Sequence, residues 1–230
     1  MCDQSNRNGN KNNNKSSNAD IQMKIIATED CDKVIKFLWE NFFPYAPLAG
    51  SEPKWIPSRE DEMVLREGIT KHNCSIVAMK EDQIIGVSIA LPKNRSAADE
   101  YFEAAKKAGK NKHGYIMQLL GEIMCKTDIF NRYGVEETLY VYLVSVAPNQ
   151  RGRNIAYLMM RELMRVGKEK KFEVLSIDCS SYYCAQVCER LGMECLSTVP
   201  FSDYLDEKGE VIFRPSPPHV AMETYAQRLQ

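Results

Sequence analysis

The stretch Thr138–Ala156, TLYVYLVSVAPNQRGRNIA, contains a strand, a short basic loop and the beginning of a helix. Its first half is a run of large apolar residues with interleaved tyrosines, which is typical of a strand. Pro148 ends this strand because proline has no N–H group to donate to a sheet. From Ile155 onward, apolar residues recur at steps of three and four, which predicts a helix to about Lys171.

The loop between strand and helix brings free backbone N–H groups and two guanidinium groups, Arg151 and Arg153, to one helix N-terminus. This combination is suited to a phosphate or pyrophosphate. The loop lacks both the Gly-Lys-Ser/Thr ending of a P-loop and the G-x-G-x-x-G of a Rossmann turn. The alternative is an ordinary strand-to-helix turn with surface arginines, which does not explain the register of strand, loop and helix together.

The composition indicates a soluble globular protein. The chain has 230 residues, of which 44% are hydrophobic, and a formal net charge of −1. This charge argues against a nucleic-acid partner, and no apolar run is long enough to cross a membrane. The eight cysteines are irregularly spaced without a C-x-x-C pair, so we expect reduced thiols in a cytoplasmic protein, with neither a disulfide framework nor a metal site.

Residues 1–20 are rich in Asn, Lys and Ser, and we expect a disordered polar tail because they offer little apolar surface to bury. Residues 21–230 are expected to form one domain of alternating strands and helices. Strands are predicted at 21–28, 74–79, 83–91, 139–146, 172–179, 193–201 and 211–214. Helices are predicted from 31 to just before Pro44, and at 58–72, 97–108, 115–130, 155–171 and 182–191. A polar tail is expected after Met222.

The segment FFPYAPLAG, residues 42–50, is aromatic and interrupted twice by proline, so it is predicted to lack regular structure. Such an apolar loop either packs over the core or forms part of a pocket wall, and the residues alone favour neither. The two helical patterns between Pro92 and Thr138 are expected to contribute to a substrate pocket.

The basic loop resembles the acyl-CoA signature R/Q-x-x-G-x-G/A of the GNAT acetyltransferases. Asn154 stands where that family usually has glycine, and Asn tolerates left-handed dihedrals better than most residues. Four later segments resemble the insect arylalkylamine N-acetyltransferases: CSSYY at 179–183, ERLGM at 189–193, F-x-x-Y at 201–204, and FRP with PPH between 213 and 219.

The resemblance implies the α/β GNAT acyltransferase fold, with a mixed central β-sheet splayed between the fourth and fifth strands and flanked by helices. It also implies acetyl-CoA as cosubstrate, with the pantetheine arm paired to a strand backbone and the pyrophosphate on the basic loop. The residues implied to bind acetyl-CoA are Leu143, Val144, Ser145, Val146, Gln150, Arg151, Gly152, Arg153, Asn154, Ile155, Ala156 and Ser181.

The chemistry of such a transfer can be reasoned from pKa values. An alkylamine has a pKa of roughly 10, so it must lose a proton before it attacks the thioester. The departing thiolate, whose conjugate acid has a pKa of about 8.5, needs little assistance. Holding both substrates in line supplies much of the rate, and a strand N–H near Val146 could stabilise the oxyanion. No covalent enzyme intermediate is needed.

The chain departs from the family at two catalytic positions. The general-base glutamate of the family's D-E-P-L motif is matched by Ala46, so we expect deprotonation through a water chain or a nearby carboxylate, with Glu52 as the candidate. The two catalytic serines of the family match Ser180 and Cys184. Ser180 is expected to orient the amine or thiol and Cys184 to lie near the acetyl sulfur. Helix capping by Ser180 and Ser181, and a core position for Cys184, are the alternatives.

Aromatic side chains suit an arylalkylamine pocket, and the candidate substrate-binding residues are Phe43, Tyr45, Tyr142 and His219. We expect acetylation of a small amine such as dopamine, serotonin, tyramine or histamine, by a monomer or weak dimer. One alternative is the same reaction on polyamines or other aliphatic amines, for which acidic residues should line the pocket. The other is a CoA-binding module with little turnover.

Overall fold

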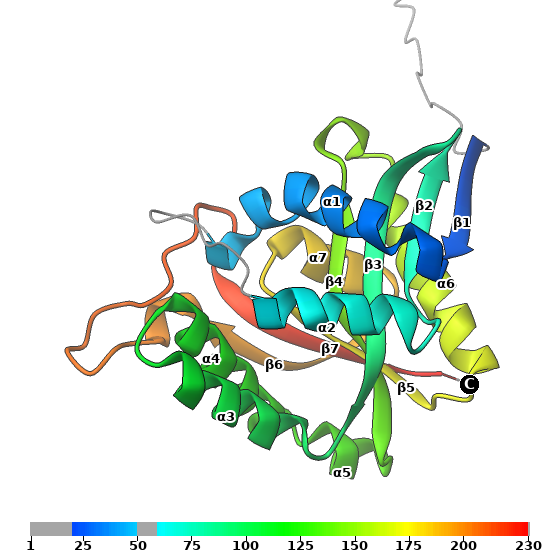
Figure 1. Cartoon of the computed structure of the whole chain (residues 1–230). Helices are drawn as coiled ribbons and strands as arrows, with labels where there is room; N and C mark the ends of the chain where they lie inside the picture. Colours follow the sequence, from blue (N-terminus) through cyan, green and yellow to red (C-terminus); the bar gives the residue numbers. More distant parts are fainter. Residues whose placement is uncertain (1–19, 50–58, 230) are drawn as a thin grey trace, which may run out of the picture.

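The computed structural model describes residues 20–49 and 59–229, and within them a seven-stranded sheet has the order β1-β2-β3-β4-β5-β7-β6 (Figure 1). β4 and β5 pair in parallel, whereas the other neighbouring strands are antiparallel. The mixed sheet expected from the sequence is therefore present. The strands are β1 Ile21–Ile25, β2 Ile76–Lys80, β3 Gln83–Asn94, β4 Glu137–Val146, β5 Val174–Cys179, β6 Glu194–Pro200 and β7 Ala221–Arg228.

The helices cover both faces of this sheet (Figure 1). Helices α6 and α7 pack on one face, and α1 and α2 pack on the other. Helices α3 and α4 lie against each other and bury a third cluster with Phe201 and Phe213. The helices are α1 Cys31–Asn41, α2 Arg59–Thr70, α3 Ala97–Ala108, α4 Lys112–Thr127, α5 Ile129–Tyr133, α6 Ile155–Glu169 and α7 Tyr182–Arg190. Among the described residues, no helix has the length and hydropathy needed to cross a bilayer.

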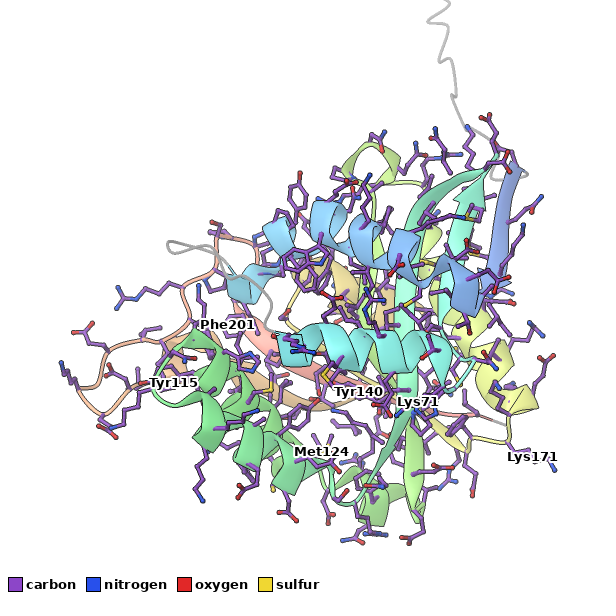
Figure 2. All side chains as sticks on the ribbon, in the orientation of Figure 1. Lys71, Tyr115, Met124, Tyr140, Lys171 and Phe201 are labelled. Atoms are coloured by element: carbon purple, nitrogen blue, oxygen red, sulfur yellow. The ribbon has the colours of Figure 1, made fainter. Side chains whose placement is uncertain are left out.

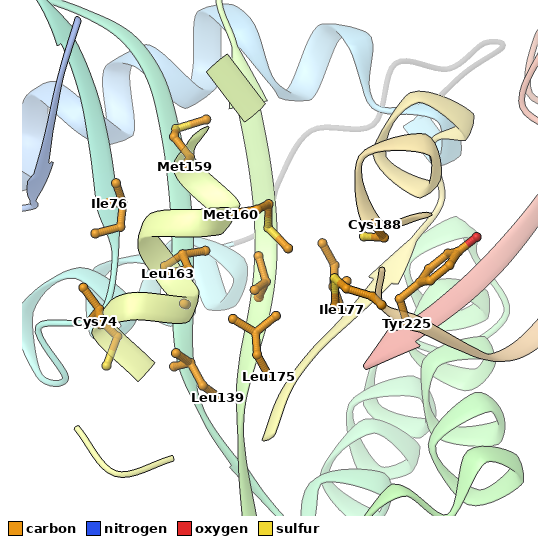
Figure 3. Close-up of a cluster of buried hydrophobic side chains, with 14 of the residues drawn as sticks. Cys74, Ile76, Leu139, Met159, Met160, Leu163, Leu175, Ile177, Cys188 and Tyr225 are labelled. Carbon is orange, nitrogen blue, oxygen red and sulfur yellow. The ribbon is translucent and has the colours of Figure 1, made fainter. Parts of the chain in front are cut away.

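The predicted helix that begins at Ile155 is confirmed, and its apolar stripe anchors one face of the sheet. Met159, Met160 and Leu163 are fully buried. Figure 3 shows them on the side of α6 that faces the strands, near Leu139 and Leu175. Burying side chains of this size contributes about 1.5–3 kcal/mol each. This packing holds the N-terminus of α6 in a fixed position at the end of β4.

Two local predictions need correction. The pattern at 115–130 is not one helix: α4 begins earlier, at Lys112, and ends at Thr127. Asp128 then adopts a left-handed conformation with φ 44°, which separates α4 from α5. The segment 42–50 is not wholly irregular either, because Phe43–Tyr45 and Pro47–Ala49 form short 3-10 turns. Proline is tolerated there because the first N–H groups of a helical turn need no internal partner.

The C-terminal region differs most from the sequence prediction. Residues 211–214 are not a strand, and Val211 forms only an isolated bridge with Leu205. The expected polar tail is instead β7, which lies between β5 and β6. Polar residues such as Thr224 and Gln227 hide this strand from a hydrophobicity pattern. Its backbone pairs with neighbours on both sides, so polar side chains do not prevent it from occupying the interior of the sheet.

Candidate active site

The sheet opens between β4 and β5. Among the described residues, the last pair between these two strands is Val141 with Ile177. β4 continues to Val146 and stays paired with β3 on its other side, whereas β5 ends at Cys179. The fourth and fifth strands are therefore splayed, as predicted. No described residue of β5 pairs with residues 142–146 of β4. On the side of β5, this part of β4 therefore has an open backbone edge.

A β-bulge lies where the splay begins. Ile89 of β3 pairs with Leu143, and the next residue, Ala90, pairs with Val141, so Tyr142 has no residue opposite it. Bulges of this kind bend a strand and change the direction of its side chains, and they are frequent beside active sites. Here Val141 packs with α6 on one face, whereas Leu143 packs with α1 and α2 on the other. The bulge places Tyr142 on the α1 and α2 face.

The loop after β4 adopts the conformations expected of an anion-binding turn. Gly152 has φ 78° and Asn154 has φ 61°. Asn154 is the N-cap residue of α6, and its left-handed conformation is one that asparagine tolerates better than most residues. Its Oδ1 accepts a hydrogen bond of 3.0 Å from Nη1 of Arg190, which connects the start of α6 to the end of α7.

The two arginines of the loop have different surroundings. The Arg153 side chain is only 17% exposed, donates from Nη1 to Oε1 of Gln150, and lies 3.9 Å from Oδ1 of Asp20. The guanidinium carbon of Arg151 lies 4.9 Å from the centre of the Tyr45 ring, and this arginine is exposed. Arg151 can therefore reach a ligand at the surface, while Arg153 helps to hold the loop.

The remaining acetyl-CoA candidates lie on the elements around the loop. The side chains of Leu143, Val144 and Val146 pack into the two cores, and Ser145 donates from Oγ to the carbonyl of Asn41 at 3.1 Å. Leu143 and Ser145 are buried and can therefore meet a ligand only through their backbone, whereas Val144 and Val146 are half-buried. In the first turn of α6, Ile155 is buried and Ala156 is half-buried.

The catalytic candidates cluster after β5, except Glu52, which lies outside the described residues. Ser180 is half-buried directly beyond the end of β5. Ser181 occupies the N-cap position of α7, although its side chain makes no capping hydrogen bond. Cys184 lies in the first turn of α7, with its sulfur atom within 4.8 Å of those of Cys179 and Cys188.

The substrate candidates occupy different environments. Phe43 is 6% exposed and packs in the α1 and α2 core, while Tyr45 is 53% exposed. Nδ1 of His219 accepts a hydrogen bond of 3.2 Å from the N–H group of Tyr182, the first residue of α7. Burial lowers the pKa of His219. Its ring also meets that of Tyr183, with 5.7 Å between ring centres, so His219 belongs to the same corner as the two serines.

Sequence reasoning missed a polar group beside the bulge. Asp61 of α2 is 6% exposed, and its Oδ2 lies 3.7 Å from Nδ1 of His113 in α4. That nitrogen is buried and has no hydrogen-bond partner among the described residues. Burial and then the nearby Asp61 charge raise the pKa of Tyr142. The three residues come from separate elements, so no local pattern could have linked them.

Sequence reasoning missed a second polar group, which lies close to the point where β4 and β5 separate. Asp178, the residue before the end of β5, accepts hydrogen bonds from Thr224 at 2.6 Å and from Tyr140 at 2.9 Å. Nζ of Lys93 lies 3.9 Å from the centre of the Tyr140 ring and donates to the hydroxyl of Tyr101. Burial lowers the pKa of Lys93 to about 7, opposed by the charge of Asp178.

Burial also raises the pKa of Asp178, opposed by its hydrogen bonds and by Lys93. Tyr140 is buried, whereas Lys171 points away from the molecule (Figure 2). The sheet interior near the splay is therefore polar as well as aromatic.

An open recess of about 220 Å³ lies elsewhere, between the start of α4 and the loop 206–212. Its described lining includes Lys112, Tyr115 and Glu210, and none of it comes from β4 or β5. Because the backbone edge, the bulge and the basic loop all lie around β4, we place the candidate active site there and not in this recess.

Comparisons with known proteins agree with this geometry. The model of the acetyltransferase (GNAT) family matches residues 32–193. A crystal structure of agmatine N-acetyltransferase superposes with a TM-score of 0.84 at 29% identity, covering 91% of this chain and all of that one. The polyamine N-acetyltransferase of Drosophila melanogaster, which forms N-acetylagmatine, gives 0.83 at 29% identity over the same shares.

A mosquito arylalkylamine N-acetyltransferase like 5b gives a TM-score of 0.83 at 27% identity, again covering 91% of this chain and all of that one. The family model covers more than half of the chain, and the splayed sheet is the one that the resemblance implied. The chain therefore belongs to the GNAT family of acetyltransferases.

Proposed function

We propose that this protein transfers the acetyl group of acetyl-CoA to the primary amine of a small arylalkylamine by direct attack in a ternary complex. The main support is the open backbone edge of β4 at residues 142–146, which leads directly into the left-handed loop before α6. An extended pantetheine arm can add to such an edge as a strand does. The helix N-terminus and Arg151 suit the pyrophosphate.

The aromatic residues around the bulge favour an arylalkylamine. Tyr142 sits at the bulge, and Tyr140 and Tyr101 both lie close to Lys93. Such side chains provide flat apolar walls for an aryl group, with hydroxyls that can accept or donate hydrogen bonds. Ser180, next to the splay, would orient the amine or the thiol. Cys184, one helical turn further on, would lie near the acetyl sulfur.

A second candidate is an amine with another cationic group, such as agmatine or a polyamine. The observation in its favour is Asp61, a buried carboxylate beside Tyr142. A carboxylate in this position can pair with a distal guanidinium or ammonium group of the substrate. Two of the similar structures are enzymes that act on agmatine or polyamines.

Release of free thiol from acetyl-CoA across a panel of amines distinguishes these candidates. We expect tyramine, dopamine, serotonin or histamine to give a kcat/KM at least tenfold above that of agmatine and spermidine, because aromatic walls favour the aryl group. Asp61→Asn should then affect tyramine, dopamine and serotonin by less than about threefold, since none of these three has a second cationic group to pair with a carboxylate.

If agmatine leads the panel and Asp61→Asn removes its advantage, the second candidate is correct. Binding of acetyl-CoA without thiol release for any amine would leave only a CoA-binding module.

The pH–rate profile tests how the amine loses its proton, since Ala46 cannot accept one. Glu52→Gln is expected to lower kcat/KM by about 10²–10⁴ at neutral pH and to remove the acidic limb, as loss of a general base does. An unchanged profile excludes Glu52 as the base. The proton would then leave through a water chain, which is the other route expected from the sequence.

A further inference from the structure

Three cysteine thiols converge where β5 meets α7. Cys179 ends β5, while Cys184 and Cys188 lie one turn apart on α7. All three sulfur atoms lie within 4.8 Å of one another, and those of Cys179 and Cys188 are 3.7 Å apart. Figure 3 shows Cys188 on the inner side of α7, near Ile177 and Tyr225. The spacing C-x-x-x-x-C-x-x-x-C contains no C-x-x-C pair, so this cluster could not be predicted from the spacing of the cysteines.

We propose that Cys179, Cys184 and Cys188 form a binding site for a thiophilic d¹⁰ metal ion, held by three sulfur ligands. Soft thiolate ligands select ions such as Cu(I) and Zn²⁺ over harder cations. Among the described residues, no histidine or carboxylate joins the three cysteines as a fourth ligand. Zinc in structural sites takes four ligands, so the three-sulfur set fits Cu(I) better than Zn²⁺.

The spacing of the sulfur atoms matches such an ion. With metal–sulfur bonds of about 2.3 Å, three ligands in a plane around an ion lie about 4.0 Å apart, and tetrahedral ligands about 3.8 Å apart. The distances here, from 3.7 Å to no more than 4.8 Å, require movements of an ångström or less. A disulfide requires sulfur atoms only about 2.05 Å apart, a larger movement for two side chains packed in the core.

Access to the cluster also suits a metal ion. A bound ion forms three bonds to sulfur and displaces the thiol protons to solvent. Cys179 and Cys188 are 2% and 0% exposed, so the half-buried Cys184 is the point of entry.

Titration of the reduced, metal-free full chain with Cd²⁺ tests the site, because thiolate-to-cadmium charge transfer absorbs in the near ultraviolet. Competition for Cu(I) against a chelator gives the affinity. One equivalent of each ion should bind, and the melting temperature should rise because the ion ties α7 to β5. Cys184→Ser should lower Cu(I) affinity at least tenfold and reduce the charge-transfer band. The exposed Cys125→Ser is the matched control and should change neither.

Cys184→Ser is chosen because Cys184 is the least buried of the three residues and serine is nearly the same size. Circular dichroism of the metal-free variant verifies its fold. Three outcomes would overturn the proposal: no stoichiometric Cd²⁺ or Cu(I) binding to the wild-type chain, equal binding by Cys184→Ser, or equal loss in Cys125→Ser. A Cys179–Cys188 disulfide that forms in air and persists when Cu(I) is offered under reducing conditions would also overturn it.

Discussion

Replacement of Gly152 by valine is expected to raise the dissociation constant for acetyl-CoA by about 10–100-fold, while the protein stays folded. Gly152 has φ 78°, a conformation that side chains with a branched Cβ rarely adopt, and forcing it costs about 1–3 kcal/mol. An added Cβ at this position would have no protein atom within 4 Å. The valine would therefore disturb the loop backbone and occupy the space next to it, where a pyrophosphate would lie, without disrupting the core.

The control for this variant is Gly209→Val. Gly209 has φ 80° and equally open surroundings, but it lies in the exposed turn after Asp206, away from β4 and α6. The backbone strain should therefore be the same in both variants, while only Gly152→Val should weaken acetyl-CoA binding. Calorimetric titration with acetyl-CoA measures the difference. Unchanged affinity in Gly152→Val would show that the pyrophosphate does not bind on this loop.

Asp178→Ala is expected to destabilise the fold by about 2–6 kcal/mol, because it leaves two buried hydroxyl donors without an acceptor. The carboxylate accepts hydrogen bonds from Thr224 and Tyr140, and its charge opposes the lowering of the Lys93 pKa. For a chain of this size the melting temperature should fall by roughly 10 °C. Urea unfolding with and without the substitution measures the free energy.

Two further variants separate the contributions within this group. Thr224→Val removes only one hydrogen bond to Asp178, so it should cost about 0.5–1.5 kcal/mol. Lys93→Met combined with Asp178→Ala should cost less than the sum of the single variants, since neither charge is then left alone in the interior. A loss below about 1 kcal/mol in Asp178→Ala would mean that water solvates this group.

Much of the fold could be read from local patterns. The strand, Pro148, the basic loop and the helix from Ile155 are each encoded within about a dozen residues, because backbone sterics and periodicity act over that range. The left-handed conformation of Asn154 agrees with the tolerance of asparagine for that conformation. The resemblance of the loop to the acyl-CoA signature then predicted the family and the splay of the sheet, and both are confirmed.

The C-terminal part shows where local patterns fail. The AMETYAQR segment of β7 carries polar residues on both sides, so its own sequence does not distinguish it from an exposed tail. It becomes a strand because β5 and β6 present unpaired backbone groups between which it completes the sheet. The apolar residues at 211–214 met no such partner beyond the bridge at Val211.

The sequence by itself therefore determined the GNAT fold, the basic loop and the corner after β5. Only the tertiary structure decided the bulge at Tyr142, the pairing of Asp61 with His113, the position of Lys93 over the Tyr140 ring, and the convergence of three cysteines. The physical reason is common to all four. Each depends on the register between strands or on the packing of helices from distant parts of the chain, and neither follows from the spacing of residues along one element.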